Sequence, residues 1–160
     1  ITKNKGYKTY SEYWDIKLAK KIASKRKIDL IYSANTLSHI KNISEIFKAI
    51  NLALTDNGVL VLEDPSLLEC MRNLAYDQFY CEHIYVFSTL SLQKTLEVAD
   101  LEIFDIENLT THGGSNRYYI KKKKNNENDS NHIDISRLAA IAPETILIIY
   151  RRAKNTQSMM

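Results

Sequence analysis

Two short runs of apolar residues, IDLIYSAN at 28–35 and VLVLE at 59–63, constrain the fold of this chain more than any other feature. The segments that precede them, 12–27 and 42–54, space their apolar residues with the period of an amphipathic helix. Strands that are apolar along their whole length are typical of parallel sheets, which helices cover on both faces. The order helix, strand, helix, strand therefore predicts an α/β domain with a largely parallel sheet.

Weaker signals follow in the middle of the chain. Asn57-Gly58 is expected to stop the second helix, since glycine and asparagine favour the backbone that ends helices. Residues 67–77 have a helical pattern, whereas 78–88 are rich in aromatic residues and follow neither period. A serine or threonine before SLQKTLEVAD (91–100) can cap one more helix.

The last part of the chain adds strands of a different kind. Residues 101–109 alternate apolar and polar side chains, and 115–124 can pair with them as an antiparallel edge hairpin around Gly113-Gly114. The sequence NNENDSN at 125–131 is predicted to be a linker. ILIIY at 146–150 is predicted to form one more buried strand.

Composition and charge exclude several classes of partner. The net charge of +3, from 22 basic and 19 acidic residues in a chain of 160, is too small to predict nucleic-acid binding. Four consecutive lysines at 121–124 have no aromatic platform beside them and are interpreted as a solvated strand end. Cys70 and Cys81 form no zinc-binding pattern, so no metal, zinc included, is expected. No apolar run approaches membrane-spanning length and no signal peptide opens the chain, which predicts a cytoplasmic protein without a membrane partner.

The ends of the two apolar strands indicate where a ligand would bind. In parallel α/β sheets, ligands bind beyond the carboxyl ends of the strands. In this sequence those ends lead into Ser33–His39 and Glu63–Ser66. We therefore expect the ligand site at these two segments.

Four segments together carry a family pattern in their order and spacing: SANTLSHI (33–40), GVLVLEDPSLL (58–68), DQFYCEHIYVFS (77–88) and THGGSNRYYI (111–120). The most specific combination is Tyr80-x-Glu82-His83 followed by His112-Gly113-Gly114-Ser115. Over about residues 1–122 the chain resembles the S-adenosylmethionine-dependent C-methyltransferases that act on nucleotide-linked keto-deoxysugars. The resemblance implies a Rossmann-like class I methyltransferase sheet, S-adenosylmethionine as cofactor and a nucleotide-sugar substrate.

The chain departs from that family at both ends. The family begins with a zinc-binding module, a strand and a glycine-rich loop that holds the methyl donor, whereas no cysteine pair and no G-x-G-x-x-G motif precede residue 28. Residues 132–152 resemble the last stretch of the family's C-terminal α/β domain. These departures predict a truncated member with an incomplete sheet and donor site: a partial methyltransferase domain (1–124), a linker (125–131) and a remnant of the C-terminal domain (132–160). Exposed strand edges in such a sheet predict self-association.

The resemblance also assigns catalytic roles. Methylation of a carbon next to a ketone needs a base for the C–H proton, a group that stabilises the enolate, and a methyl donor in line. His83 is the favoured base, since histidine is the residue type whose pKa suits this proton transfer. Glu82 or Tyr80 is expected to orient His83 or to hydrogen-bond the developing oxyanion, and His39 is expected beside the sugar. The alternative is that Tyr80 and His83 only pack against the domain, and that His39 caps a helix or lies on the surface.

Binding residues follow from the same resemblance. Ala34 and Asn35 are expected to line the methionine part of the donor. The loop His112-Gly113-Gly114-Ser115 is expected to bind the anionic nucleotide-sugar, because paired glycines permit close backbone approach, and Arg117 can fork onto a phosphate. The alternative for this segment is an ordinary hairpin turn, with Arg117 in solvent.

Two functions are compatible with these expectations. The first is C-methylation through enolate formation and methyl transfer, in a truncated enzyme. The second is a non-catalytic remnant, or a partner-dependent interaction module of the same fold, because the sequence lacks the donor-binding glycine loop. Methylation of oxygen or nitrogen is disfavoured, since neither reaction needs the carbon-acid residues of the Tyr-x-Glu-His segment.

Overall fold

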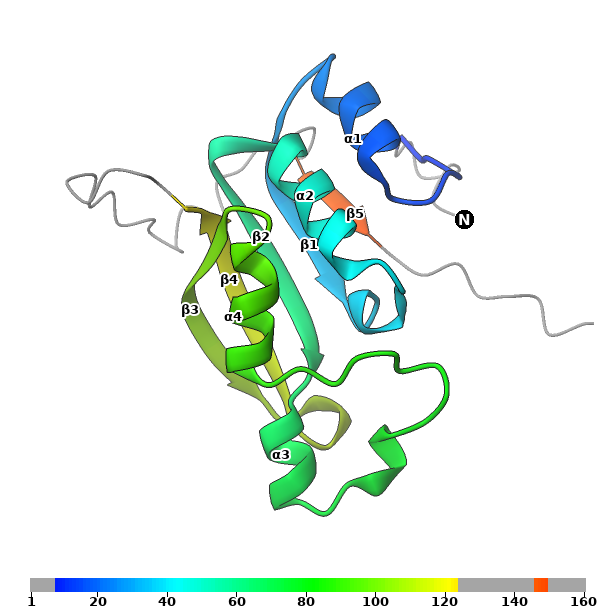
Figure 1. The fold of residues 1–160 in the computed structure, drawn as a ribbon, viewed down its shortest axis with the longest axis vertical. Coiled ribbons are helices and arrows are strands. Elements are labelled where there is room, and N and C mark those ends of the chain that lie inside the picture. The colour runs from blue at the N-terminus through cyan, green and yellow to red at the C-terminus, as the bar shows by residue number, and fades with distance from the viewer. Residues whose placement is uncertain (1–7, 124–145, 150–160) are drawn as a thin grey trace, which may run out of the picture.

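The computed structural model describes residues 8–123 and 146–149. Within these residues five strands form one mixed sheet: β1 (Ile28–Ala34), β2 (Leu54–Pro65), β3 (Leu101–Leu109), β4 (Ser115–Lys122) and β5 (Ile146–Ile149). Their order across the sheet is β3-β4-β2-β1-β5 (Figure 1). β1 is parallel to its neighbours β2 and β5, whereas β4 is antiparallel to both β2 and β3.

Helices and short 3-10 turns precede or connect the described strands. They are α1 (Ile16–Ala23), which comes before β1, and η2 (Leu37–His39), α2 (Ile43–Ala53), α3 (Leu67–Arg72), η3 (Tyr76–Gln78), α4 (Thr89–Glu97) and η4 (Thr111–Gly113). α1 begins at a capping side chain, because the Asp15 carboxylate accepts a hydrogen bond of 2.7 Å from the Leu18 amide. α4 begins at a reciprocal cap formed by Ser88 and Ser91.

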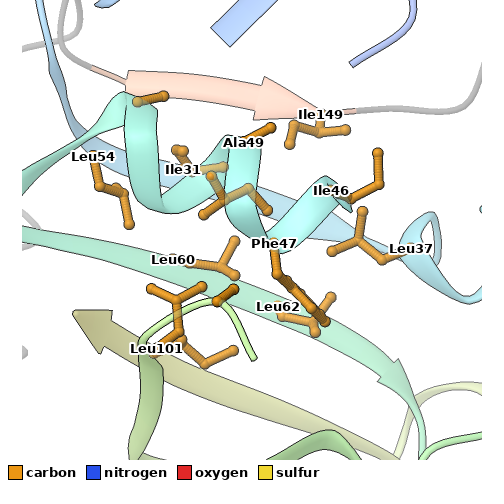
Figure 2. Close-up of a cluster of buried hydrophobic side chains, with 14 of the residues drawn as sticks. Ile31, Leu37, Ile46, Phe47, Ala49, Leu54, Leu60, Leu62, Leu101 and Ile149 are labelled. Atoms are coloured by element: carbon orange, nitrogen blue, oxygen red, sulfur yellow. The ribbon is translucent and has the colours of Figure 1, made fainter. Parts of the chain in front are cut away.

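The main apolar core lies between the sheet and the helices that cover one of its faces. α2 and α4 lie over this face, and α1 packs against α2 (Figure 1). Phe47 of α2 points toward Leu62 of β2, and Leu37 of η2 lies at the end of the cluster nearest the carboxyl end of β2 (Figure 2). Burial of these apolar side chains holds α2 and η2 against the strands. The core thereby anchors η2 at the edge of the sheet where ligands are expected.

The opposite face of the sheet carries a smaller apolar cluster made of strand residues. Val59 and Val61 of β2 and Tyr119 of β4 are buried there. In the same two strands, Leu60, Leu62 and Ile120 belong to the main core. Alternate side chains of β2 and β4 therefore lie on different faces, and this alternation decides which polar residues can reach the site.

Asn57-Gly58 does not end α2, contrary to the prediction. α2 ends at Ala53, and Leu54 takes extended backbone (φ −67°, ψ 145°) and pairs with Ile28, so β2 begins directly after the helix. Because Leu54 is fully buried, its place in the core explains this early start. β2 then runs through Gly58, where a Cβ would lie 3.0 Å from the Ile28 carbonyl oxygen, so a residue without a side chain suits this irregular stretch of the pairing.

Two helices are shorter than the periodicity predicts. α1 begins at Ile16 because Asp15 caps it, so the residues at 12–15 stay outside the helix. α3 ends at Arg72 because Leu74 adopts left-handed backbone (φ 51°), which a helix of L-residues does not accommodate. Tertiary contacts and caps, rather than the apolar spacing, therefore determine these boundaries.

The predicted edge hairpin and the predicted last strand are confirmed. β3 and β4 pair antiparallel on either side of η4, at one edge of the sheet. β5 pairs in parallel with β1 at the other edge. The linker predicted at 125–131 lies outside the described residues. In the described part of the chain, no helix is long and apolar enough to cross a membrane.

Candidate functional site

The candidate site lies where β1 and β2 end at the same edge of the sheet. β1 leads through Asn35 into η2, and β2 leads through Ser66 into α3. The aromatic-rich segment 78–88 returns to this edge, since Phe87 forms an isolated bridge with Ser66. The tertiary structure therefore brings the predicted segments together at the edge where parallel sheets bind ligands.

His83 is held by a hydrogen bond at each of its ring nitrogens. Its Nδ1 lies 2.7 Å from the Gln78 carbonyl oxygen, and its Nε2 lies 2.9 Å from the Tyr80 hydroxyl. Because a carbonyl only accepts hydrogen bonds, Nδ1 carries a proton. In the neutral form of the ring, Nε2 is then an acceptor for the Tyr80 hydroxyl. Tyr80 is 44% exposed, so the pair is open to the surface. In its neutral form, a half-buried imidazole with a partly exposed phenol beside it can exchange a proton with a bound molecule.

His39 lies beside this pair, with 4.8 Å between its ring centroid and that of His83. The Nδ1 of His39 is 2.7 Å from the Glu82 carbonyl oxygen and donates to it. In this contact Glu82 contributes its backbone rather than its carboxylate. The structure thus brings Tyr80, His83 and His39, which the resemblance assigns to one site, into one cluster.

Ser38 ties together the two segments that carry these histidines. Its carbonyl oxygen accepts hydrogen bonds from the Ile84 amide at 2.9 Å and from the Tyr85 amide at 3.1 Å. The Tyr85 hydroxyl adds a bond of 2.6 Å to the Lys41 carbonyl oxygen, just beyond η2. These bonds join η2 to the segment that carries His83.

Asn35 and His112 meet at the carboxyl end of β1, where Ala34 is the last strand residue. The Asn35 Nδ2 lies 3.3 Å from the His112 Nε2, and the Asn35 amide donates to the Glu63 carbonyl oxygen at 2.8 Å. Both residues have left-handed backbone, with φ 48° and 53°, which asparagine and histidine tolerate better than most residues. Asn35, which is predicted to contact the methyl donor, and His112, which is predicted to contact the substrate, are therefore neighbours.

The glycine turn that follows His112 packs against α3. The Gly113 carbonyl accepts from the Asn73 Nδ2 at 2.9 Å, and the Gly114 carbonyl accepts from the Ser66 amide at 3.1 Å. Gly114 has a φ of 116°, and a Cβ there would lie 2.5 Å from the Glu69 Cβ, so a side chain does not fit. A cavity of about 540 Å³ lies between α3 and this turn and is lined in part by both glycines.

Arg117 and Ser115 make contacts within the protein and do not reach the histidine cluster. The Arg117 guanidinium lies 2.6 Å from the Glu63 carboxylate and 2.6 Å from the Glu107 carboxylate. Its hydrogen bond with Glu63 raises the pKa of Arg117 further above its usual range, so the charge is permanent. Ser115 is buried, and its hydroxyl donates to the Thr111 carbonyl oxygen at 3.0 Å. Arg117 alternates along β4 with buried residues of the helix-covered face, which places it on the opposite face of the sheet.

Asp64 is a residue of this region whose state the sequence does not reveal. It is 1% exposed, and neither carboxyl oxygen has a hydrogen-bond partner among the described residues. Burial raises the pKa of Asp64 to about 7, although Ser38, which lies near the carboxyl without completing a hydrogen bond to it, lowers the pKa in part. The Asp-Pro pair marks the end of a strand, but it does not show which face the carboxyl takes, because alternate strand residues face opposite sides.

Comparison with known proteins gives matches over most of the described chain. Residues 5–106 match a family model described as a methyltransferase domain. The C-methyltransferase NovU of Streptomyces niveus is 27% identical over 116 residues, which are 72% of this chain and 28% of that protein, so this chain spans little more than a quarter of that relative. An S-adenosylmethionine-dependent methyltransferase from Clostridium acetobutylicum has 17% identity and a TM-score of 0.55, over 76% of this chain and 68% of that one.

The sequence match and the fold agree with each other. The sheet is that of a class I methyltransferase in incomplete form, with an antiparallel hairpin at one edge. The family model extends over more than half of the chain, from before α1 into β3. This chain therefore belongs to the methyltransferase-domain family.

Proposed function

We propose that this chain is the acceptor-binding part of an S-adenosylmethionine-dependent methyltransferase that methylates a carbon next to the ketone of a nucleotide-linked keto-deoxysugar. The observation that carries the proposal is the position of His83, whose Nδ1 lies 2.7 Å from the Gln78 carbonyl oxygen and whose Nε2 lies 2.9 Å from the hydroxyl of the partly exposed Tyr80. The 27% identity to a C-methyltransferase supports carbon as the methylated atom.

In the proposed reaction His83 acts as the base. Its Nδ1–H stays bound to the Gln78 carbonyl, which stabilises the positive charge that forms when Nε2 takes the proton from the carbon next to the ketone. Once protonated, Nε2 no longer accepts from Tyr80, and the phenol is available to donate to the enolate oxygen. The His39 ring lies 4.8 Å from the His83 ring and would contact the sugar.

S-adenosylmethionine supplies an electrophilic methyl group when it is bound. Ala34 and Asn35 would hold its amino-acid end, since both are half-buried at the carboxyl end of β1. The Ser33 hydroxyl beside them is buried without a partner among the described residues, which fits a polar group at this end of the strand. These residues would contact only the amino-acid end of the donor, and no G-x-G-x-x-G loop follows a strand within 8–123 and 146–149.

The base function can be tested without the methyl donor. The chain is incubated in D₂O with nucleoside-diphosphate keto-deoxysugars, and loss of the proton next to the ketone is followed by NMR. We expect exchange with the wild type and a rate about 100- to 10,000-fold lower with His83→Ala. Tyr80→Phe should slow exchange at least about tenfold, whereas Tyr13→Phe, at a position that is 93% exposed, should leave the rate unchanged.

Methyl transfer is measured separately, with methyl-labelled S-adenosylmethionine and with calorimetric titration of the donor. Labelled product would support a complete reaction in this chain. Exchange without labelled product would indicate an acceptor-binding module whose donor site needs a partner. If none of the keto-sugars exchanges its proton, the proposal of C-methylation is refuted.

A further inference from the structure

Four polar side chains are buried at the carboxyl end of the sheet without the hydrogen bonds that burial normally requires. The Asp64 carboxyl, the Asn116 side-chain oxygen and the hydroxyls of Ser33 and Ser38 have no partner among the described residues. All four residues are 6% exposed or less. Because an unpaired polar group in the interior costs free energy, this cluster needs a physical reason to exist.

The strand register places three of these side chains on one face. Asp64 of β2 pairs directly with Asn116 of β4, and Ser33 of β1 pairs with Leu62, two positions before Asp64. Directly opposite residues of an antiparallel pair have Cβ atoms about 4.5–5.5 Å apart and share a face. Leu62 belongs to the main core, so this cluster lies on the face that α2 covers.

Ser38 connects the cluster to the two histidines of the site. It lies near the Asp64 carboxyl, whose pKa it lowers, although no hydrogen bond joins the two residues. Its carbonyl oxygen accepts from the Ile84 amide at 2.9 Å. His39 directly follows Ser38 and His83 directly precedes Ile84, so a displacement of Ser38 would move both imidazoles.

We propose that Asp64 is a positioning residue, which acts through Ser38 to set the distance between His39 and His83. The role of Asp64 in catalysis rests on the proposed function, whereas the effect of Asp64 on the positions of the two imidazoles does not. A neutral carboxyl can donate to the Asn116 oxygen and accept from the Ser38 hydroxyl, so that the groups of the cluster satisfy one another. An ionised carboxylate cannot donate; it leaves the Asn116 oxygen unpaired and attracts the donors of Ser38 more strongly.

The charges near Asp64 do not compensate for its burial. Its neighbour Glu63 pairs with Arg117 on the opposite face of the sheet, at 2.6 Å. At this edge of the sheet, η2, α3 and η4 carry His39, Glu69, Cys70 and His112, and the segment that is hydrogen-bonded to Ser38 carries His83. Burial is the dominant influence and raises the pKa of Asp64 to about 7, so both protonation states are populated near neutrality.

The imidazole nitrogens report this positioning directly. In the full chain labelled with ¹⁵N and ¹³C, the ring signals of His39 and His83 and the Asp64 carboxyl carbon are followed from about pH 5 to about pH 9. We expect both histidines to show an inflection at the pH where Asp64 titrates, and we expect Asp64→Asn to remove it. Asp56→Asn makes the same change near the other end of β2, where the side chain is 87% exposed, and should leave the inflection in place.

Superimposable histidine titrations in the wild type and in Asp64→Asn would overturn the proposal. Should Asp64→Asn fail to fold, Ser38→Ala provides a second measurement, because it removes the hydroxyl and keeps the carbonyl. We then expect the Asp64 titration to move to higher pH, since Ser38 lowers the pKa of that carboxyl, and the histidine inflection to move with it. An unmoved Asp64 titration in Ser38→Ala would equally overturn the proposed link.

The catalytic consequence is measured with the D₂O exchange reaction. Asp64→Ala should lower kcat about 10- to 100-fold while KM stays within about twofold, because misplaced catalytic groups slow chemistry more than binding. Asp64→Asn should restore most of the rate, since its amide can donate to Asn116. A change confined to KM would contradict a positioning role. If the wild type shows no exchange, the proposed function fails, while the histidine titrations still decide whether Asp64 positions the imidazoles.

Discussion

Replacement of Asp64 by asparagine should change how the stability of the domain depends on pH. In the folded protein, burial raises the pKa of Asp64 from 3.8 to about 7. The unfolded chain releases this proton near the ordinary value, so between the two pKa values the folded state binds a proton that the unfolded state has lost. The stability of the wild type relative to Asp64→Asn should therefore decrease as the pH rises through this window, and should stay constant above it.

The size of the effect follows from the distance between the two pKa values. About three pH units at about 1.4 kcal/mol each amount to about 4 kcal/mol. Because asparagine does not titrate, Asp64→Asn should gain about this much free energy of unfolding, relative to the wild type, between about pH 4 and about pH 8. The other ionisable groups are common to both proteins and cancel from the difference. A change of this size is a large fraction of the stability of an ordinary domain, which is about 5–15 kcal/mol.

The measurement is urea unfolding of both proteins at a series of pH values, followed by circular dichroism. Asp56→Asn serves as the control, because its carboxylate is 87% exposed and should give a curve parallel to that of the wild type. If the curves of Asp64→Asn and the wild type are also parallel across the window, the reasoning is refuted. Such a result would mean that the Asp64 carboxyl is hydrated or paired in the folded protein.

Four further substitutions test the packing and the charge pairs. Phe47→Ala should lower the free energy of unfolding in urea by about 3–5 kcal/mol, because the ring is fully buried in the main core, and a loss below about 1 kcal/mol would contradict that placement. In the same assay Gly114→Ala should cost about 1–3 kcal/mol of stability. This loss should exceed that of Gly113→Ala, because an added Cβ would lie 2.5 Å from its nearest neighbour at Gly114 but 3.9 Å at Gly113. Equal losses would argue against the close approach at Gly114. Arg117→Ala should cost about 1–3 kcal/mol of stability and leave KM for the exchange reaction unchanged, because two carboxylates already bind the guanidinium. A raised KM would instead place Arg117 in contact with the substrate.

The order of elements in this fold can be predicted from local patterns alone. The continuous apolar run of β1, the one-sided apolar spacing of α2 and the alternation of β3 each follow from the geometry of a single helix or strand. The family resemblance, rather than a local pattern, implies that His39 and His83 lie at one substrate, and the structure places their rings 4.8 Å apart. Element boundaries are less predictable, as the early start of β2 at Leu54 shows, because burial against another strand decides them.

The faces of the strands, by contrast, depend on the tertiary structure. Asn116 and Arg117 are adjacent polar residues, yet one is buried opposite Asp64 and the other binds Glu63 on the other face. A shift of one residue in the pairing of β4 with β2 would exchange the two faces, and nothing local in the sequence sets that register. The expectation that Arg117 reaches a phosphate therefore has no support from its position in the sheet.

The state of Asp64 has the same origin. Its sequence position indicates the end of a strand, which is a local property. Its burial depends on η2, which Leu37 anchors in the core and which brings Ser38 against the carboxyl. Local patterns thus determined which helices and strands form. Only the packing of distant segments determined which polar groups lose their contact with water, because that loss depends on the neighbours that surround each group in the folded domain.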